Sequence, residues 1–114
     1  MKTKTNDRLG LYRSLVVSLA EVMSQPSDLR LIVETEEFVS GDNNDYRYYM
    51  IDTVAGLEKN LGCGRYDGDD CDAWIVCSND GAACVGTRNV GNIVHFVGAL
   101  IDKRRATKVY AEIY

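Results

Sequence analysis

The residues best suited to chemistry lie in one turn, from Gly86 to Gly91, between a short apolar run and a helical pattern. The first backbone amides of a helix are free to bind an anion, and a nearby arginine can add its charge. Thr87, Arg88, Asn89 and Gly91 are therefore candidate anion-binding residues. The turn has neither the Gly-Lys-Ser/Thr of a Walker A loop nor the spacing of G-x-G-x-x-G, which favours an ordinary helix cap over a nucleotide site.

The single histidine, His95, falls in the helical pattern that follows this turn. A general base needs a nucleophile or an acid within hydrogen-bonding reach. The sequence places no serine, cysteine or lysine beside it. We therefore predict that the chain is not an enzyme and that His95 is structural. The alternative is a small-ligand or nucleotide-binding domain at the turn, in which His95 takes part in catalysis.

Metal-binding patterns are weak in this chain. The acidic loop over residues 67–72 offers carboxylate oxygens, but it has no glycine at the sixth position of an EF-hand loop, and Ser78 stands where the bidentate glutamate belongs. Cysteines occur at positions 63, 71, 77 and 84, without the paired C-x-x-C spacing of structural zinc sites. We predict no metal and no cofactor.

Cys77 and Cys84 flank an Asp80-Gly81 hairpin turn and would face each other across the two strands. Opposed residues of this kind lie within the range that a disulfide tolerates. The chain has no run of eighteen apolar residues, and its start has no apolar signal region, so we predict a cytoplasmic protein with no membrane partner. The cytosol is reducing, and for this reason we expect all four cysteines to be thiols.

The charge of the chain indicates the kind of partner. Seventeen acidic residues outweigh thirteen basic ones, and the net charge is −4. This balance disfavours direct binding to nucleic acid, whose phosphates attract lysine and arginine, and it favours a basic protein surface. Tyrosine adds contact area with a polar tip. The predicted partner-binding residues are the acidic Glu34, Glu36, Glu37, Asp67, Asp69 and Asp70 and the tyrosines Tyr46, Tyr48 and Tyr110.

Periodic patterns predict the elements that carry these residues. Leu9, Tyr12, Leu15, Val16, Leu19, Val22 and Met23 recur at helical spacing, after a cap at Thr5, Asn6 or Asp7 and before Pro26. Alternating patterns predict a hairpin of strands 30–38 and 45–51, then a short helix to residue 61 capped by Asp52 or Thr53. A second hairpin, 73–77 with 82–85, breaks at Gly86 and leads to a helix over 90–101 and a strand over 108–114.

The order α-β-β-α-β-β-α-β predicts one α+β domain over residues 1–114, a two-layer sandwich with a mostly antiparallel sheet. Helices are expected on one face, although strands that are apolar on both sides allow helices on both.

Three functions are consistent with these observations. The first is a small acidic, non-enzymatic protein that binds and blocks a larger, basic protein. In size and composition such a chain is similar in style to inhibitors carried by phages and mobile elements, the anti-CRISPR and antirestriction proteins. The second is the ligand-binding domain described above. The third is a homo-oligomeric module that pairs through an exposed edge such as 108–114, so that the chain is a monomer or a homodimer.

Overall fold

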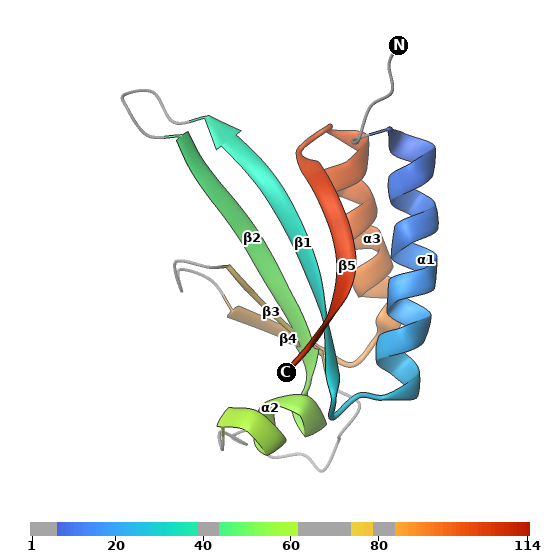
Figure 1. Ribbon diagram of the computed structural model, residues 1–114, viewed down its shortest axis with the longest axis vertical. Coiled ribbons are helices and arrows are strands. Elements are labelled where there is room, and N and C mark those ends of the chain that lie inside the picture. The colour runs from blue at the N-terminus through green and yellow to red at the C-terminus, as the bar shows by residue number, and fades with distance from the viewer. Residues whose placement is uncertain (1–6, 39–43, 62–73, 79–83) are drawn as a thin grey trace.

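The chain folds into a five-stranded antiparallel sheet with two long helices, α1 (Arg8–Ser24) and α3 (Val90–Asp102), on one face (Figure 1). A short helix, α2 (Val54–Leu61), lies at one end of the sheet. This computed structural model describes residues 7–38, 44–61, 74–78 and 84–114. The predicted α+β class and the predicted order of elements are confirmed.

The strands run in the order β4-β3-β2-β1-β5 across the sheet, and each pairs antiparallel with its neighbours. Neighbours in sequence are neighbours in space except at β5, which returns after α3 to pair with β1. The predicted interior strand, β3, does lie between two others, whereas β4 and β5 form the two edges. The five strands are β1 (Leu29–Phe38), β2 (Asn44–Thr53), β3 (Trp74–Ser78), β4 (Cys84–Thr87) and β5 (Ala106–Ile113).

The core lies between the sheet and the two long helices. Leu31 of β1 pairs with Ile51 of β2 and with Ala111 of β5, and Leu31 and Ile51 are 0% exposed. Residues that pair directly across strands share a face of the sheet. This row therefore packs beneath α1 and α3, whose inner side chains Leu15 and Val97 belong to the same core.

Helix α1 begins as predicted but buries a different set of side chains. Asp7 caps it, because its carboxylate accepts a hydrogen bond from the backbone N–H of Gly10 at 3.1 Å. The predicted stripe is wrong at three positions, since Leu9, Val16 and Met23 are 59%, 67% and 52% exposed. The apolar residues of this helix occur on all its sides. Their spacing alone therefore cannot identify the face that is buried. Its buried residues are Leu11, Leu15, Ser18, Leu19 and Val22.

The other two helices begin at caps that the sequence indicated. The Asn89 side chain accepts a hydrogen bond from the N–H of Gly91 at 2.7 Å and caps α3. Thr53, one of the two predicted caps of α2, accepts one from the N–H of Gly56 at 3.1 Å. Among the helices of the described ranges, none is long and apolar enough to cross a membrane.

Two expectations about the second hairpin are corrected. β4 does not break at Gly86 but continues to Thr87, because Ile75 of β3 pairs with Gly86 and extends the ladder. Cys77 does lie opposite Cys84 in the register, but Cys77 is disulfide-bonded and is not the thiol that we expected. Disulfides persist in oxidising compartments, so cysteine usage no longer supports a cytoplasmic location. Cys63, Cys71 and the predicted turn at Asp80-Gly81 lie outside the described residues.

Gly56 marks the tightest backbone approach in the described part of the chain. A Cβ atom at Gly56 would lie 2.6 Å from the Tyr114 hydroxyl and 2.7 Å from the Pro26 carbonyl oxygen, and it would also collide with the Asp52 carboxylate. At Gly10 in α1 the nearest atom, Asp7 Oδ2, is 3.4 Å away. The first site has no room for a methyl group, and the second has room.

We predict opposite effects for alanine at these two glycines. Gly56→Ala should lower the free energy of unfolding by about 1–3 kcal/mol, because it overpacks a site bounded by the Pro26 backbone and by the Asp52 and Tyr114 side chains. Gly10→Ala should raise it by up to about 1 kcal/mol, because alanine favours the helix. Urea denaturation of both variants measures this. Equal changes in the two variants would contradict the packing at Gly56.

Candidate functional site

The sheet has a second face, opposite α1 and α3, which neither long helix covers; we call it the open face, although Ile32 and Asp52 on it are only 2% and 3% exposed. Strand alternation and the pairing register define it. Glu34 of β1 pairs with Tyr48 of β2 and Lys108 of β5, and the next row toward the sheet end is Ile32, Met50 and Tyr110. The positions on the open face are Arg30, Ile32, Glu34 and Glu36 of β1, Tyr46, Tyr48, Met50 and Asp52 of β2, and Lys108, Tyr110 and Glu112 of β5.

The register brings most of the predicted partner-binding strand residues to this face. By register, Glu34, Glu36, Tyr46, Tyr48 and Tyr110 occupy neighbouring positions on it. Glu37 alternates to the other face. The acidic loop with Asp67, Asp69 and Asp70 lies outside the described residues. Tyr110 joins the group only because β5 pairs with β1, and sequence spacing does not reveal that pairing.

A hydrogen bond between neighbouring strands fixes the centre of the open face. The Tyr110 hydroxyl donates to Glu34 Oε2 at 2.7 Å, and both residues are half-buried. The backbone carbonyl of Glu34 also accepts from the Thr107 hydroxyl at 3.2 Å. A phenol held against a carboxylate in this way is positioned before any partner arrives, so that less conformational entropy is lost on binding.

A second charged group lies toward the other end of the same face. The Arg30 guanidinium pairs with Glu112 Oε2 at 2.8 Å and stacks over the Tyr114 ring, 4.9 Å from its centroid. Sequence reasoning missed Arg30, Glu112 and Tyr114 as members of the face. No spacing signal could have found them, because Arg30 and Glu112 are 82 positions apart.

Beside this group lies a buried carboxyl. Asp52 is 3% exposed; its Oδ1 atom accepts from the N–H of Thr53 at 2.8 Å, and its Oδ2 atom has no partner among the described residues. Burial raises the pKa of Asp52 to about 7, against smaller opposing effects of the Thr53 hydrogen bond and the Arg30 charge. Two residues near Asp52 also bury a polar atom that has no hydrogen-bond partner among the described residues. These atoms are Arg30 Nε and the Tyr114 hydroxyl oxygen.

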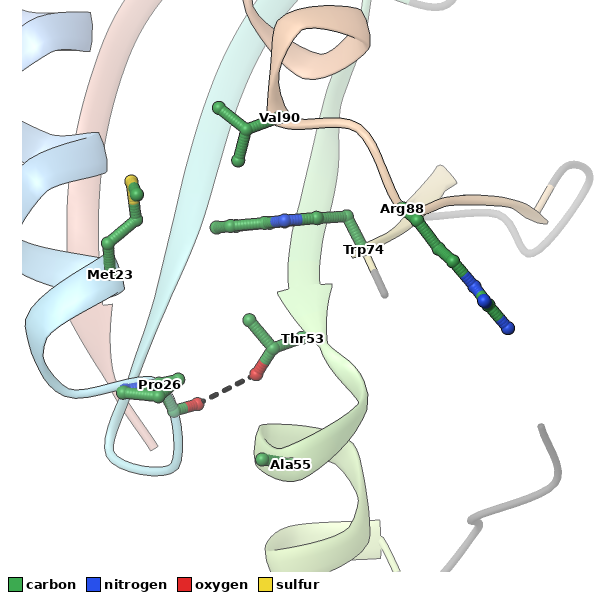
Figure 2. Close-up of a pocket in the computed structure, with 7 residues that line it drawn as sticks. All are labelled: Met23, Pro26, Thr53, Ala55, Trp74, Arg88 and Val90. Atoms are coloured by element: carbon green, nitrogen blue, oxygen red, sulfur yellow. Dashed lines mark hydrogen bonds between the residues drawn. The ribbon is translucent and has the colours of Figure 1, made fainter. Parts of the chain in front are cut away.

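A separate cavity of about 490 Å³ opens between the end of α1 and the start of α3 (Figure 2). The Trp74 indole crosses it between Val90 and Thr53, and the Thr53 hydroxyl donates to the Pro26 carbonyl at 3.0 Å. Figure 2 shows the Arg88 guanidinium pointing away from the other lining side chains. The remaining walls are mostly apolar, so this cavity suits an apolar group better than an anion. Its lining residues are Met23, Pro26, Thr53, Ala55, Trp74, Arg88 and Val90.

The predicted anion-binding turn uses its own polar groups. Thr87 Oγ1 accepts from the Asn89 N–H at 3.2 Å and from the Asn92 side-chain amide at 2.8 Å. The Gly91 N–H donates to the Asn89 side chain, and the Asn92 N–H donates to the Asn89 carbonyl at 2.9 Å. Three of the amides that an anion would need are thus engaged, and the turn has the geometry of a helix cap.

His95 is exposed on α3. Asp102, the acid nearest to it on the same helix, accepts hydrogen bonds from the Tyr12 hydroxyl at 2.9 Å and from Arg8 at 3.2 Å. This carboxylate therefore orients groups of α1. In the part of the chain that the structure describes, no group of three or more His, Cys, Asp or Glu residues could hold a metal ion.

Comparison with known proteins adds no relative. No protein-family model, no curated protein and no solved structure matches this chain. The function must therefore be argued from the chain's own residues, of which the open face is the most coherent set.

We predict that Asp52 lowers stability as the pH rises. Its pKa of about 7 in the folded chain lies above the ordinary value of 3.8, so folding binds a proton between these pH values. The contribution of Asp52 is fully favourable below about pH 4, is lost as the pH rises to about 7, and is constant above that. Asp52→Asn should abolish this slope and raise the free energy of unfolding at pH 8 by about 2–4 kcal/mol.

Asp28→Asn is the matched control, because Asp28 is an exposed carboxylate that pairs with Lys59 at the surface. It should change the free energy of unfolding by less than about 1 kcal/mol at any pH. Chemical denaturation between pH 4 and pH 8 measures both variants. If Asp52→Asn keeps the slope of the unsubstituted chain, the carboxyl is not buried as described.

Proposed function

We propose that this chain is a non-enzymatic binding protein whose open face occupies, and thereby blocks, a basic surface of a larger protein. The observation that supports this most directly is the placement of Glu34, Glu36, Tyr46, Tyr48 and Tyr110 at neighbouring positions on a sheet face that α1 and α3 leave uncovered. Tyrosine is enriched at protein interfaces, where its ring supplies contact area and its hydroxyl a hydrogen bond.

The charges of the open face favour a basic partner. Arg30 is paired with Glu112, which leaves Lys108 opposite Glu34 in the register, and Glu36 occupies the next position of this face along β1. The net charge of −4 adds a long-range attraction for cationic surfaces that speeds encounter and weakens with added salt. A partner that presents lysine or arginine beside an apolar patch would match both the carboxylates and the phenol rings.

Other features of the chain agree with binding rather than catalysis. The cap at Thr87 and Asn89 uses amides that a nucleotide phosphate would need. Asp102 bonds to Tyr12 and Arg8 of α1 and so is engaged away from His95. A nucleotide-binding or hydrolytic role for the turn is therefore the weaker proposal.

We predict that a single charge reversal on the open face removes partner binding. When the chain is immobilised on a resin, it should retain one basic protein from a lysate of its native cell. Raising the salt concentration should release that protein. Glu34→Lys should lower the retained amount at least about tenfold, because it places a cation against a basic surface and breaks the bond to Tyr110. Tyr110→Ala should act similarly, whereas Tyr110→Phe should keep most of the binding because the ring remains.

Glu21→Lys is the control, since Glu21 is an exposed carboxylate on α1, on the other side of the sheet. It changes the net charge by the same amount as Glu34→Lys. Circular dichroism melting verifies that each variant is folded. Loss of the retained protein with both lysine variants would mean that net charge alone drives retention, and retention by folded Glu34→Lys would overturn the proposal.

A further inference from the structure

The edge strand β5 has a self-complementary sequence. Lys108 and Glu112 lie two residues to either side of Tyr110, on the same face of the strand, and Val109 and Ala111 flank it on the other face. An antiparallel pairing of β5 with a second β5, centred on Tyr110, therefore sets Lys108 of each copy opposite Glu112 of the other.

From these residues we infer that the chain forms a two-fold symmetric homodimer in which β5 pairs with β5 of a second copy and the two sheets join into one. The interface is isologous, as a two-fold axis requires. This inference concerns the edge of the sheet and does not depend on the function proposed for the open face.

The charges of the two copies continue one alternating row. Within one copy, Arg30 pairs with Glu112, and Glu34 lies beside Lys108 in the register. Across the proposed interface the row reads Arg30, Glu112, then Lys108 and Glu34 of the second copy, so that positive and negative charges alternate along it. Lys108 is exposed and has no ion-pair partner among the described residues of its own chain. The second copy would supply one.

The helix that packs on β5 also carries exposed apolar side chains. α1 packs most extensively on β5, and Figure 1 shows both elements on the side away from β3 and β4. The helix has 17 residues and the strand has 8, which gives both a length of about 25 Å, so that α1 runs the length of the edge. Val16, Val17 and Met23 of α1 and Ile113 of β5 are more than half exposed. β5 is an edge strand of eight residues, and its outer backbone groups are open to pairing.

The register of the pairing is tested by mixing two charge variants. Wild-type chain in sedimentation equilibrium should give twice the 12.7 kDa mass of one chain as concentration rises. Lys108→Glu sets glutamate against glutamate twice and Glu112→Lys sets lysine against lysine twice, so each variant alone should dissociate at least about tenfold more readily. An equimolar mixture of the two should dimerise again, because each variant then meets its complement.

Loss of the Arg30 partner or repulsion at Glu34 inside one chain cannot explain rescue by mixing, since neither variant changes its own fold on mixing. A monomeric wild type at every concentration overturns the inference, and would leave the edge free or bound to a different chain. Two other results would also overturn the inference: single variants that dimerise as strongly as wild type, and folded variants that stay monomeric when they are mixed.

A second test remains decisive if the charge variants fail to fold. Tyr110→Cys places two cysteines at the two-fold axis, within the Cα separation of about 4.4–6.8 Å that a disulfide needs. Mild oxidation with oxidised glutathione should then link position 110 to position 110 between chains, as peptide mass spectrometry would show. Thr107→Cys, which lies opposite position 113 in this register, should give no such link. Equal cross-linking of both variants, or none at position 110, rejects the pairing.

Discussion

One strand, β1, holds the domain together because it must satisfy two other strands and two helices at once. It pairs with β2 from Leu31 to Phe38 and with β5 on its other side, and its Leu31 and Val33 side chains are 0% exposed beneath the helices. The two polar contacts that order the open face depend on this strand. The bond of Tyr110 to Glu34 and the pair of Arg30 with Glu112 both cross from β5 to β1.

Different types of interaction stabilise the two faces of the sheet. Beneath α1 and α3 the packing is apolar, and its contribution to stability scales with the buried area. On the open face, hydrogen bonds and ion pairs order tyrosine and charged side chains at the surface, and these cost little to rearrange in water. Near α2 a polar group is buried: the carboxyl of Asp52 is enclosed, and its Oδ2 atom has no hydrogen-bond partner among the described residues. Such a site lowers stability, and a mostly apolar core must offset that cost.

The local part of this structure could be predicted from the sequence. Caps at Asp7, Thr53 and Asn89 follow from side-chain chemistry at the first turn of a helix, and Cys77 opposite Cys84 follows from the length of a hairpin. These are contacts between residues close in sequence, where geometry leaves few choices. The class and the order of elements are sums of such local signals.

Contacts between distant residues could not be predicted in this way. Nothing in the patterns of residues 29–38 and 106–113 shows that they pair, so the grouping of Tyr110 with Glu34 and the enclosure of Asp52 were out of reach. The inner face of α1 was misplaced because apolar residues occur around the whole helix. Cys77 is disulfide-bonded and not the expected thiol, because that expectation follows from a reducing compartment, whereas the strand register sets Cys77 opposite Cys84. In each case a tertiary contact decided the outcome.

The return of the last strand to the first has a consequence for how the molecule assembles. Glu34 and Tyr110 are 76 positions apart, so the loop that their contact closes carries a large entropic cost, and topologies of this kind fold slowly. Before β5 pairs with it, β1 is an edge strand on that side, and it is rich in isoleucine, leucine and valine. Another nascent chain could pair with this edge. Pairing with β5 covers this side of β1 and transfers the unpaired edge of the sheet to β5.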